Sequence, residues 1–166
     1  MPFGFNKSLL LVWVCIAACS TATIAQCKIT LKIGARLSVK CLPTEDEDHP
    51  RIATAPAQSR PFIERVVGGV KYIVAFDEET HRIKFIHTVD RAFRTKNGLR
   101  VGYQIRVSRK QITGGCCGWY TLAGQTLDGW DIIIARKNIL DDEGLNDWKE
   151  GEIRTVTIGA FIKGGN

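Results

Sequence analysis

The stretch from Lys71 to Val89, KYIVAFDEETHRIKFIHTV, decides the fold. Its first part, Lys71–Phe76, and its last part, Arg82–Val89, both place apolar side chains at every second position. A period of two is typical of β-strands, and the polar run DEETH between the two parts is typical of a turn. The stretch therefore predicts an antiparallel hairpin, whose second strand turns one face inward with the side chains Ile83, Phe85, His87 and Val89.

The chain downstream continues this pattern and contains no proline after residue 61. Three further segments are predicted as strands: Trp119–Leu122, Gly129–Ala135 and Ile153–Lys163. The segment Leu99–Val107 fits either another strand or the entry to a short helix that ends near Gln111. Short strands separated by glycine-containing breaks favour a mainly β fold, α+β at most. We expect a small antiparallel sheet or partial barrel over residues 62–166, with at most one or two short helices.

Composition sets the broad class of the protein. The chain has 166 residues, which corresponds to one domain or one domain with a tail. It is 45% hydrophobic and 24% charged, an ordinary globular composition that excludes a collagen, a coiled coil and a wholly disordered chain. The formal net charge is +6.

The first 25 residues have the features of an export signal. Lys7 supplies a positive start, and the uncharged run Ser8–Ala18 is too short to span a bilayer, which needs about 20 apolar residues. Cleavage is predicted either before Cys19 or after Ala25. The residues Ile16-Ala17-Ala18-Cys19 resemble the lipobox of bacterial lipoproteins, a resemblance that implies lipidation of Cys19 and anchoring to a membrane.

Four cysteines remain beyond the signal: Cys27, Cys41, Cys116 and Cys117. Apolar alternation on either side of Gly34 predicts a β-hairpin over residues 26–41, closed by a disulfide between Cys27 and Cys41. Cys116 and Cys117 would then form a vicinal bridge or stay reduced, and in the alternative each pairs with one N-terminal cysteine. Disulfides persist in oxidising compartments, which agrees with export.

Residues 42–61 have the composition of a connector. They hold four of the five prolines and the acidic run Glu45–Asp48. Too few apolar residues are present to pack a core, so this stretch predicts a linker or a long loop. The acidic run lacks the alternating spacing that surrounds a calcium ion, and we expect no metal site there.

A second resemblance rests on the spacing of residues after the hairpin. The residues Asp90-x-x-Phe93-x-Thr95-x-x-Gly98-Leu99-x-Val101-Gly102, together with the later Gly-Trp pair and C-terminal strand, resemble a pattern in uncharacterised bacterial exported proteins. The resemblance extends over residues 70–163. It implies a compact β-rich periplasmic or surface domain and carries no catalytic residue.

Motifs for catalysis are absent from the sequence. We find no G-x-S-x-G, H-E-x-x-H or P-loop motif, so we predict no catalytic residues and no cofactor. His87 shares the predicted face of Ile83 and Phe85, and we expect a core histidine with its hydrogen bonds satisfied.

Charge and aromatic residues define a candidate binding surface. Residues 82–110 contain nine basic residues and one acidic residue, whereas residues 128–154 contain eight acidic and four basic ones. The basic block has two interpretations: a solvated sheet face that keeps the domain soluble, or a surface that attracts anionic partners such as phospholipid headgroups or acidic glycans. The candidate surface consists of three basic and three aromatic residues: Arg91, Arg94, Arg100, Trp119, Tyr120 and Trp130. Core packing is the competing interpretation of the aromatic residues.

These features favour a non-enzymatic exported envelope protein that serves as a small binding or structural module. Its expected location is the periplasm, the outer membrane, to which lipidated Cys19 would anchor it, or the outside of the cell. The expected partner is a protein or another envelope component, and export argues against nucleic acid. One alternative is a secreted or periplasmic inhibitor or immunity-type protein that blocks a cell-wall hydrolase or toxin. Another is a redox protein that works through Cys116 and Cys117.

Overall fold

The computed structural model describes residues 27–42, 50–55, 58–114, 119–135, 148–149 and 151–164. These residues form nine strands: β1 (Arg51–Ala55), β2 (Gln58–Val67), β3 (Val70–Phe76), β4 (Ile83–Thr88), β5 (Gln104–Ser108), β6 (Ile112–Gly114), β7 (Tyr120–Gln125), β8 (Asp131–Ile134) and β9 (Ile153–Gly164). Their only helical turns are two 3₁₀ turns, Val39–Cys41 and Arg109–Gln111. The mainly β fold class is therefore confirmed.

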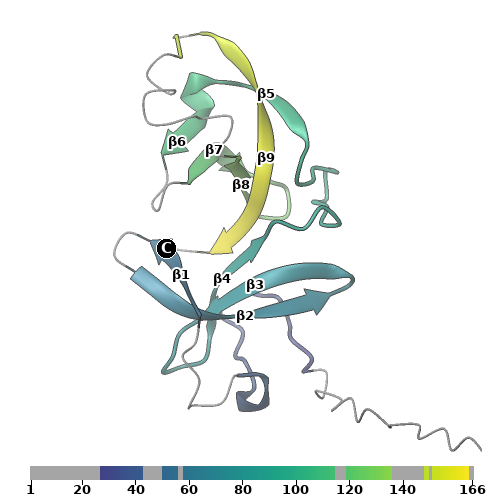
Figure 1. The fold of residues 1–166 in the computed structure, drawn as a ribbon, viewed down its shortest axis with the longest axis vertical. Helices are drawn as coiled ribbons and strands as arrows, with labels where there is room; N and C mark the ends of the chain where they lie inside the picture. Colours follow the sequence, from purple (N-terminus) through teal and green to yellow (C-terminus); the bar gives the residue numbers. More distant parts are fainter. Residues whose placement is uncertain are drawn as a thin grey trace, which may run out of the picture.

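The strands build one antiparallel sheet that curls into an open half-barrel (Figure 1). Its order is β1-β2-β3-β4-β9-β8-β7-β6, and β5 also pairs with β9. The predicted hairpin is present as β3 and β4, in which Ile73 lies opposite His87. The stretch around residues 103–111, which the sequence leaves open, is the strand β5 followed by a 3₁₀ turn.

β4 and β5 lie end to end along the same edge of β9. Thr88, the last residue of β4, is opposite Phe161, and the backbone N–H of Gly102 donates to the carbonyl of Ile158. β8 pairs with the other edge of β9. The N–H of Ala135, the residue that follows β8, donates to the carbonyl of Thr157 on the same edge. Residues 89–102 therefore form a loop that connects β4 and β5, the two strands in the row along this edge of β9.

The sheet is buried on both faces. Phe161 packs in the main cluster with Val74, Ile86 and Phe93, whereas its neighbours Ala160 and Ile162 pack on the opposite face with Phe85. The prediction of one inward face on β4 is wrong, because a β-bulge at Ala75/Phe76 shifts the register. Ile86 and Thr88 are buried, and Val89 is 59% exposed.

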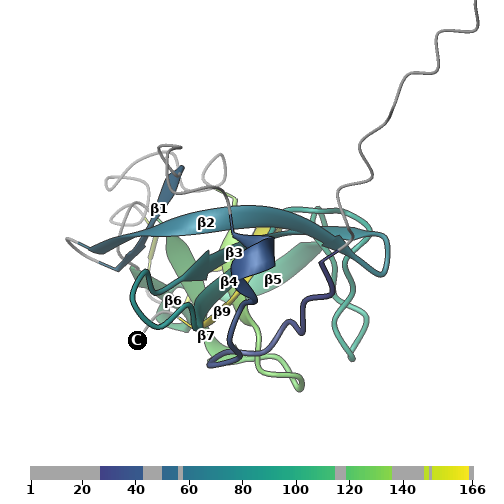
Figure 2. The ribbon, with the colours of Figure 1, turned by 90° about the horizontal axis from the view of Figure 1, so that it is seen from below.

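The predicted hairpin over residues 26–41 does not form. The turn at Gly34 is present, but the following backbone bonds to the chain before β4: Leu37 N–H donates to the carbonyl of His81, and Ile83 N–H donates to that of Ala35. In Figure 2 this segment, in purple and blue, passes across β4. Its apolar residues cover the main core instead of a partner strand, because a two-stranded ribbon alone is only marginally stable.

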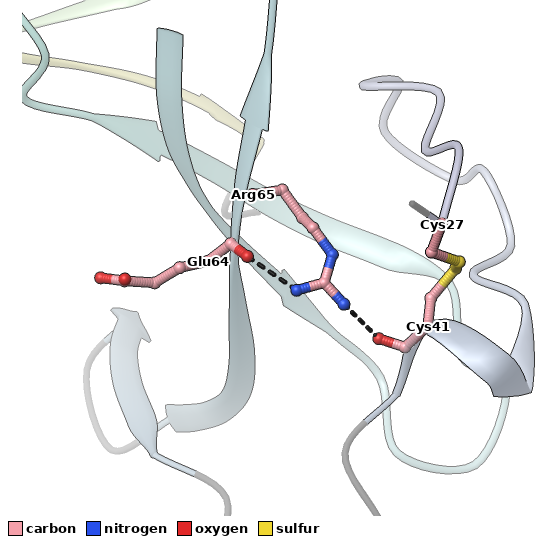
Figure 3. Close-up of a disulfide and its surroundings, with 4 residues drawn as sticks. All are labelled: Cys27, Cys41, Glu64 and Arg65. Atoms are coloured by element: carbon pink, nitrogen blue, oxygen red, sulfur yellow. Dashed lines mark hydrogen bonds between the residues drawn. A yellow bond between two sulfur atoms is a disulfide. The ribbon is translucent and has the colours of Figure 1, made fainter. Parts of the chain in front are cut away.

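The disulfide Cys27–Cys41 is present and joins the two ends of this segment. Arg65 of β2 ties it to the sheet, as Figure 3 shows. The guanidinium donates one hydrogen bond to the carbonyl of Cys41 at 2.6 Å and another to the carbonyl of Glu64 at 2.8 Å. Covalent closure and this clamp therefore hold the N-terminal segment against the half-barrel.

The prediction of a linker over residues 42–61 is wrong for its second half. β1 and the start of β2 pair there, with Arg51 opposite Pro61. Pro61 is tolerated because it stands where β2 changes partner: the register with β3 begins only at Phe62, opposite Ala75. A proline lacks the N–H that a ladder needs, and strand ends and partner switches are positions that spare it. The acidic run Glu45–Asp48 lies outside the described residues.

We expect the paired substitution Cys27→Ser and Cys41→Ser to lower the free energy of unfolding by about 3 kcal/mol, because the bridge closes a short loop in the unfolded chain. Urea denaturation measures this loss. The matched control is Ser38→Ala in the same segment, where the exposed serine makes no side-chain capping bond. A double variant as stable as this control would contradict the structural role of the bridge.

Candidate functional site

The loop Val89–Gly102, which we call the basic loop, is the strongest candidate site. It leaves β4 and returns to β5 within three residues along β9, so its two ends are close together. Compact surface loops of this length with neighbouring ends frequently carry function. The basic loop holds four basic residues and one acidic residue.

Aromatic packing fixes the middle of the basic loop. The ring of Phe93 is 4.8 Å from that of Trp130 and 4.9 Å from that of Phe161, centroid to centroid. Tyr72 of β3 meets the same ring edge-on at 6.1 Å. Phe93 is 5% exposed, so the loop is anchored in the main core by a side chain of its own.

Hydrogen bonds fix the two ends of the loop. The carboxylate of Asp90 accepts backbone N–H bonds from Ala92 at 2.9 Å and from Lys71 at 2.8 Å. These bonds lower the pKa of Asp90, the bond from Ala92 most strongly. In the second half, the Thr95 hydroxyl accepts the N–H of Leu99, and Gly98 closes the turn at a φ of +81°, a conformation that glycine adopts without strain.

The residues of the basic loop fall into two sets. Asp90, Phe93, Thr95 and Gly98 build the loop. The four basic residues form the second set: Arg91, Arg94 and Lys96 are exposed, and Arg100 is half-buried. Within the described part of the chain, none of these four cations forms an ion pair with a carboxylate.

Two of the predicted basic residues converge on one pocket. Arg91, Arg100, Val101, Gly102 and Tyr103 line an open pocket of about 350 Å³, which we call the basic pocket. The Arg100 guanidinium carbon lies 4.4 Å from the centre of the Tyr103 ring, a cation–π contact that orients it. Among the described residues that line the pocket, two are arginines and none carries a carboxylate, which suits a phosphate or carboxylate group.

The other candidate residues lie elsewhere. Arg94 is exposed on the basic loop but does not line the pocket. Trp130 is 8% exposed and belongs to the core, so the aromatic platform that includes it is not formed. Tyr120 packs beside the smaller cluster of Val107 and Ile134. Cys19, Cys116 and Cys117 lie outside the described residues.

Trp119 takes part in a different arrangement, on the face of the sheet away from the main core. Its ring stacks on His87 at 5.5 Å and on Phe85 at 5.8 Å. The expectation of a satisfied histidine is wrong, because Nδ1 of His87 is buried and has no partner among the described residues. Burial lowers the pKa of His87, so the ring is neutral near pH 7.

Sequence reasoning missed Tyr103, a residue that is 36% exposed and completes the lining of the basic pocket. The short spacing from Arg100 is the signal that could have found it. Among the described residues, no group of three His, Cys, Asp or Glu side chains is placed to hold a metal ion. The same part of the chain contains no helix that is long and apolar enough to cross a membrane.

Comparisons with protein-family models, with curated proteins and with solved structures found no match to this chain.

We expect Phe93→Ala to lower the free energy of unfolding by about 3–5 kcal/mol, because it removes the buried ring that anchors the basic loop. Thermal or urea denaturation measures the effect. The neighbouring exposed Arg94→Ala is the control and should change stability by no more than about 0.5 kcal/mol. Equal effects of the two substitutions would mean that Phe93 does not anchor the loop.

Proposed function

We propose that this chain is a non-enzymatic exported envelope protein, a binding module that recognises an anionic group through the basic loop. The observation that carries this proposal is that the loop contains two sets of residues with different roles. One set of residues fixes its shape in the core, and another set presents cations to solvent. Holding like charges together in this way costs electrostatic energy, and an anion that binds to them offsets this cost.

The chemistry of the pocket defines the ligand class. Guanidinium groups form paired, charge-assisted hydrogen bonds with phosphates and carboxylates, and the fixed loop limits the entropy lost on binding. Phospholipid headgroups supply the first group and acidic glycans supply the second. Both are components of a cell envelope.

Export is supported by the N-terminal signal pattern and by the disulfide Cys27–Cys41, since oxidising compartments preserve such bridges. We expect the intact mass of the native protein to correspond to a chain that begins at Cys19 with acyl groups, or at Gln26 without them. Reduction should add the mass of two hydrogens for each bridge. A native chain that retains Met1, with every cysteine as a free thiol, would overturn the proposed export.

The binding proposal is tested with two polyanions: vesicles of phosphatidylglycerol and polygalacturonate. We expect the purified protein to bind at least one of them, more weakly as salt is raised, and to bind neither phosphatidylcholine vesicles nor a neutral glycan. The double substitution Arg91→Glu and Arg100→Glu should weaken binding by about tenfold or more.

A matched control separates the basic pocket from net charge. Lys28→Glu with Lys32→Glu makes the same charge change at two exposed lysines of the N-terminal segment, outside the basic loop. We expect this variant to retain most of the affinity. Equal losses in the two double variants, or no binding of either polyanion, would contradict the proposed site.

A further inference from the structure

The outer edge of β5 is a sheet edge without a partner strand in the described part of the chain. β5 pairs with β9 from Gln104, opposite Thr157, to Ser108, opposite Ile153. No other described strand pairs with it. Figure 1 shows β5 on the side of β9 away from β6, β7 and β8. An open edge of this kind is a template for an added strand.

The hydrogen bonds identify which backbone groups face outward. Ile158 N–H donates to the carbonyl of Tyr103, so the backbone carbonyl of Tyr103 faces β9. In an antiparallel pair, the residues whose backbone groups face the partner strand alternate with residues whose backbone groups face away. The backbone N–H and C=O groups of Gln104, Arg106 and Ser108 therefore face outward. The N–H of Ser108 is already bonded to the side chain of Gln111 at 2.8 Å. Gln104 and Arg106, both exposed, therefore present the available donors and acceptors.

The basic pocket stands at the start of this edge and on the same side. Asp90 accepts the N–H of Lys71 in β3, so the basic loop begins on the side of β4 that faces away from β9. The outer edge of β5 faces the same way, because β4 and β5 form one row along β9. Tyr103, which lines the pocket, directly precedes Gln104.

Resting on the proposed function, we propose that the outer edge of β5 binds the extended acidic C-terminal segment of a partner protein, with its terminal carboxylate in the basic pocket. A strand that runs antiparallel to β5 reaches the pocket at its own C-terminal end, where the carboxylate meets Arg91 and Arg100. Backbone bonds to Gln104 and Arg106 supply the remaining contacts, and acidic side chains complement Arg106.

A second copy of the chain fits this edge poorly. Antiparallel self-pairing centred on β5 would place Arg106 directly opposite the same residue of the other copy. Like charges directly opposite each other destabilise a strand pair. The positive charge therefore discourages self-association and favours an acidic strand.

The test uses the full-length protein and a fluorescent peptide, EVEVE, with a labelled N-terminus and a free C-terminus. We expect amidation of the C-terminus to weaken binding by about tenfold, because the carboxylate no longer pairs with the guanidinium groups. Two further peptides carry N-methyl groups on one or the other alternate set of residues. Only one set can face β5, so only one of these peptides should lose affinity, again by about tenfold.

A protein variant provides an independent measurement. Gln104→Pro removes the outward N–H but none that bonds to β9, and Gln104→Ala keeps it. The proline variant should bind at least about fivefold more weakly than the alanine variant, with circular dichroism confirming that both are folded. If the proline variant does not fold, the methylated peptides decide the question with the wild-type protein.

The outcomes separate this inference from the proposed function. Loss of affinity on amidation, with equal effects or no effect of the two methylated peptides, overturns the added strand and leaves anion binding by the pocket intact. Failure of the peptide to bind, while polyanions still bind through Arg91 and Arg100, has the same meaning. Failure of both kinds of ligand overturns the proposed function as well.

Discussion

The packing of Phe93 against Trp130 and Phe161 is the contact on which the rest of the candidate site depends. Each residue of an ordered loop costs about 1–2 kcal/mol of backbone entropy, which surface hydrogen bonds alone offset poorly. A buried ring in the middle of the loop supplies the missing stabilisation. The ring contacts Trp130, which directly precedes β8, and Phe161 of β9. The shape of the loop is therefore coupled to the integrity of the half-barrel. Arg91 and Arg100 can then line one pocket to which no described residue contributes a carboxylate.

Much of the sheet could be predicted from period-two patterning, because β3, β4 and β9 are long enough and apolar enough to display it. The short strand β8 could be predicted only from its run of three isoleucines. The failures have physical causes. Prolines and charges hide β1 and β2, since a proline signals a loop unless one knows that the strand changes partner at that residue. The segment 27–41 alternates like a hairpin, but its apolar side chains are used to cover the core of a sheet formed elsewhere in the chain.

The candidate site was predictable only as a concentration of positive charge. The sequence shows that bases gather between residues 82 and 110, yet spacing alone does not say that Arg91 and Arg100 meet while Arg94 stands apart. The convergence depends on the turns around Thr95 and Gly102, which are set by hydrogen bonds to Leu99 and Ile158. The sequence leaves Trp130 either exposed or buried, and its packing against Phe93 and Tyr72 places it in the core.

The end-to-end arrangement of β4 and β5 has a consequence for how such a protein can diversify. Because both ends of the intervening segment are fixed to nearby residues of β9, the segment is a cassette between Thr88 and Tyr103. Sequences of other lengths and charges can be grafted there while the strand row remains in register, provided that they keep one large ring directed inward. The surface residues of this segment can therefore vary while the strand row persists, as long as the buried ring that couples the segment to the half-barrel is retained.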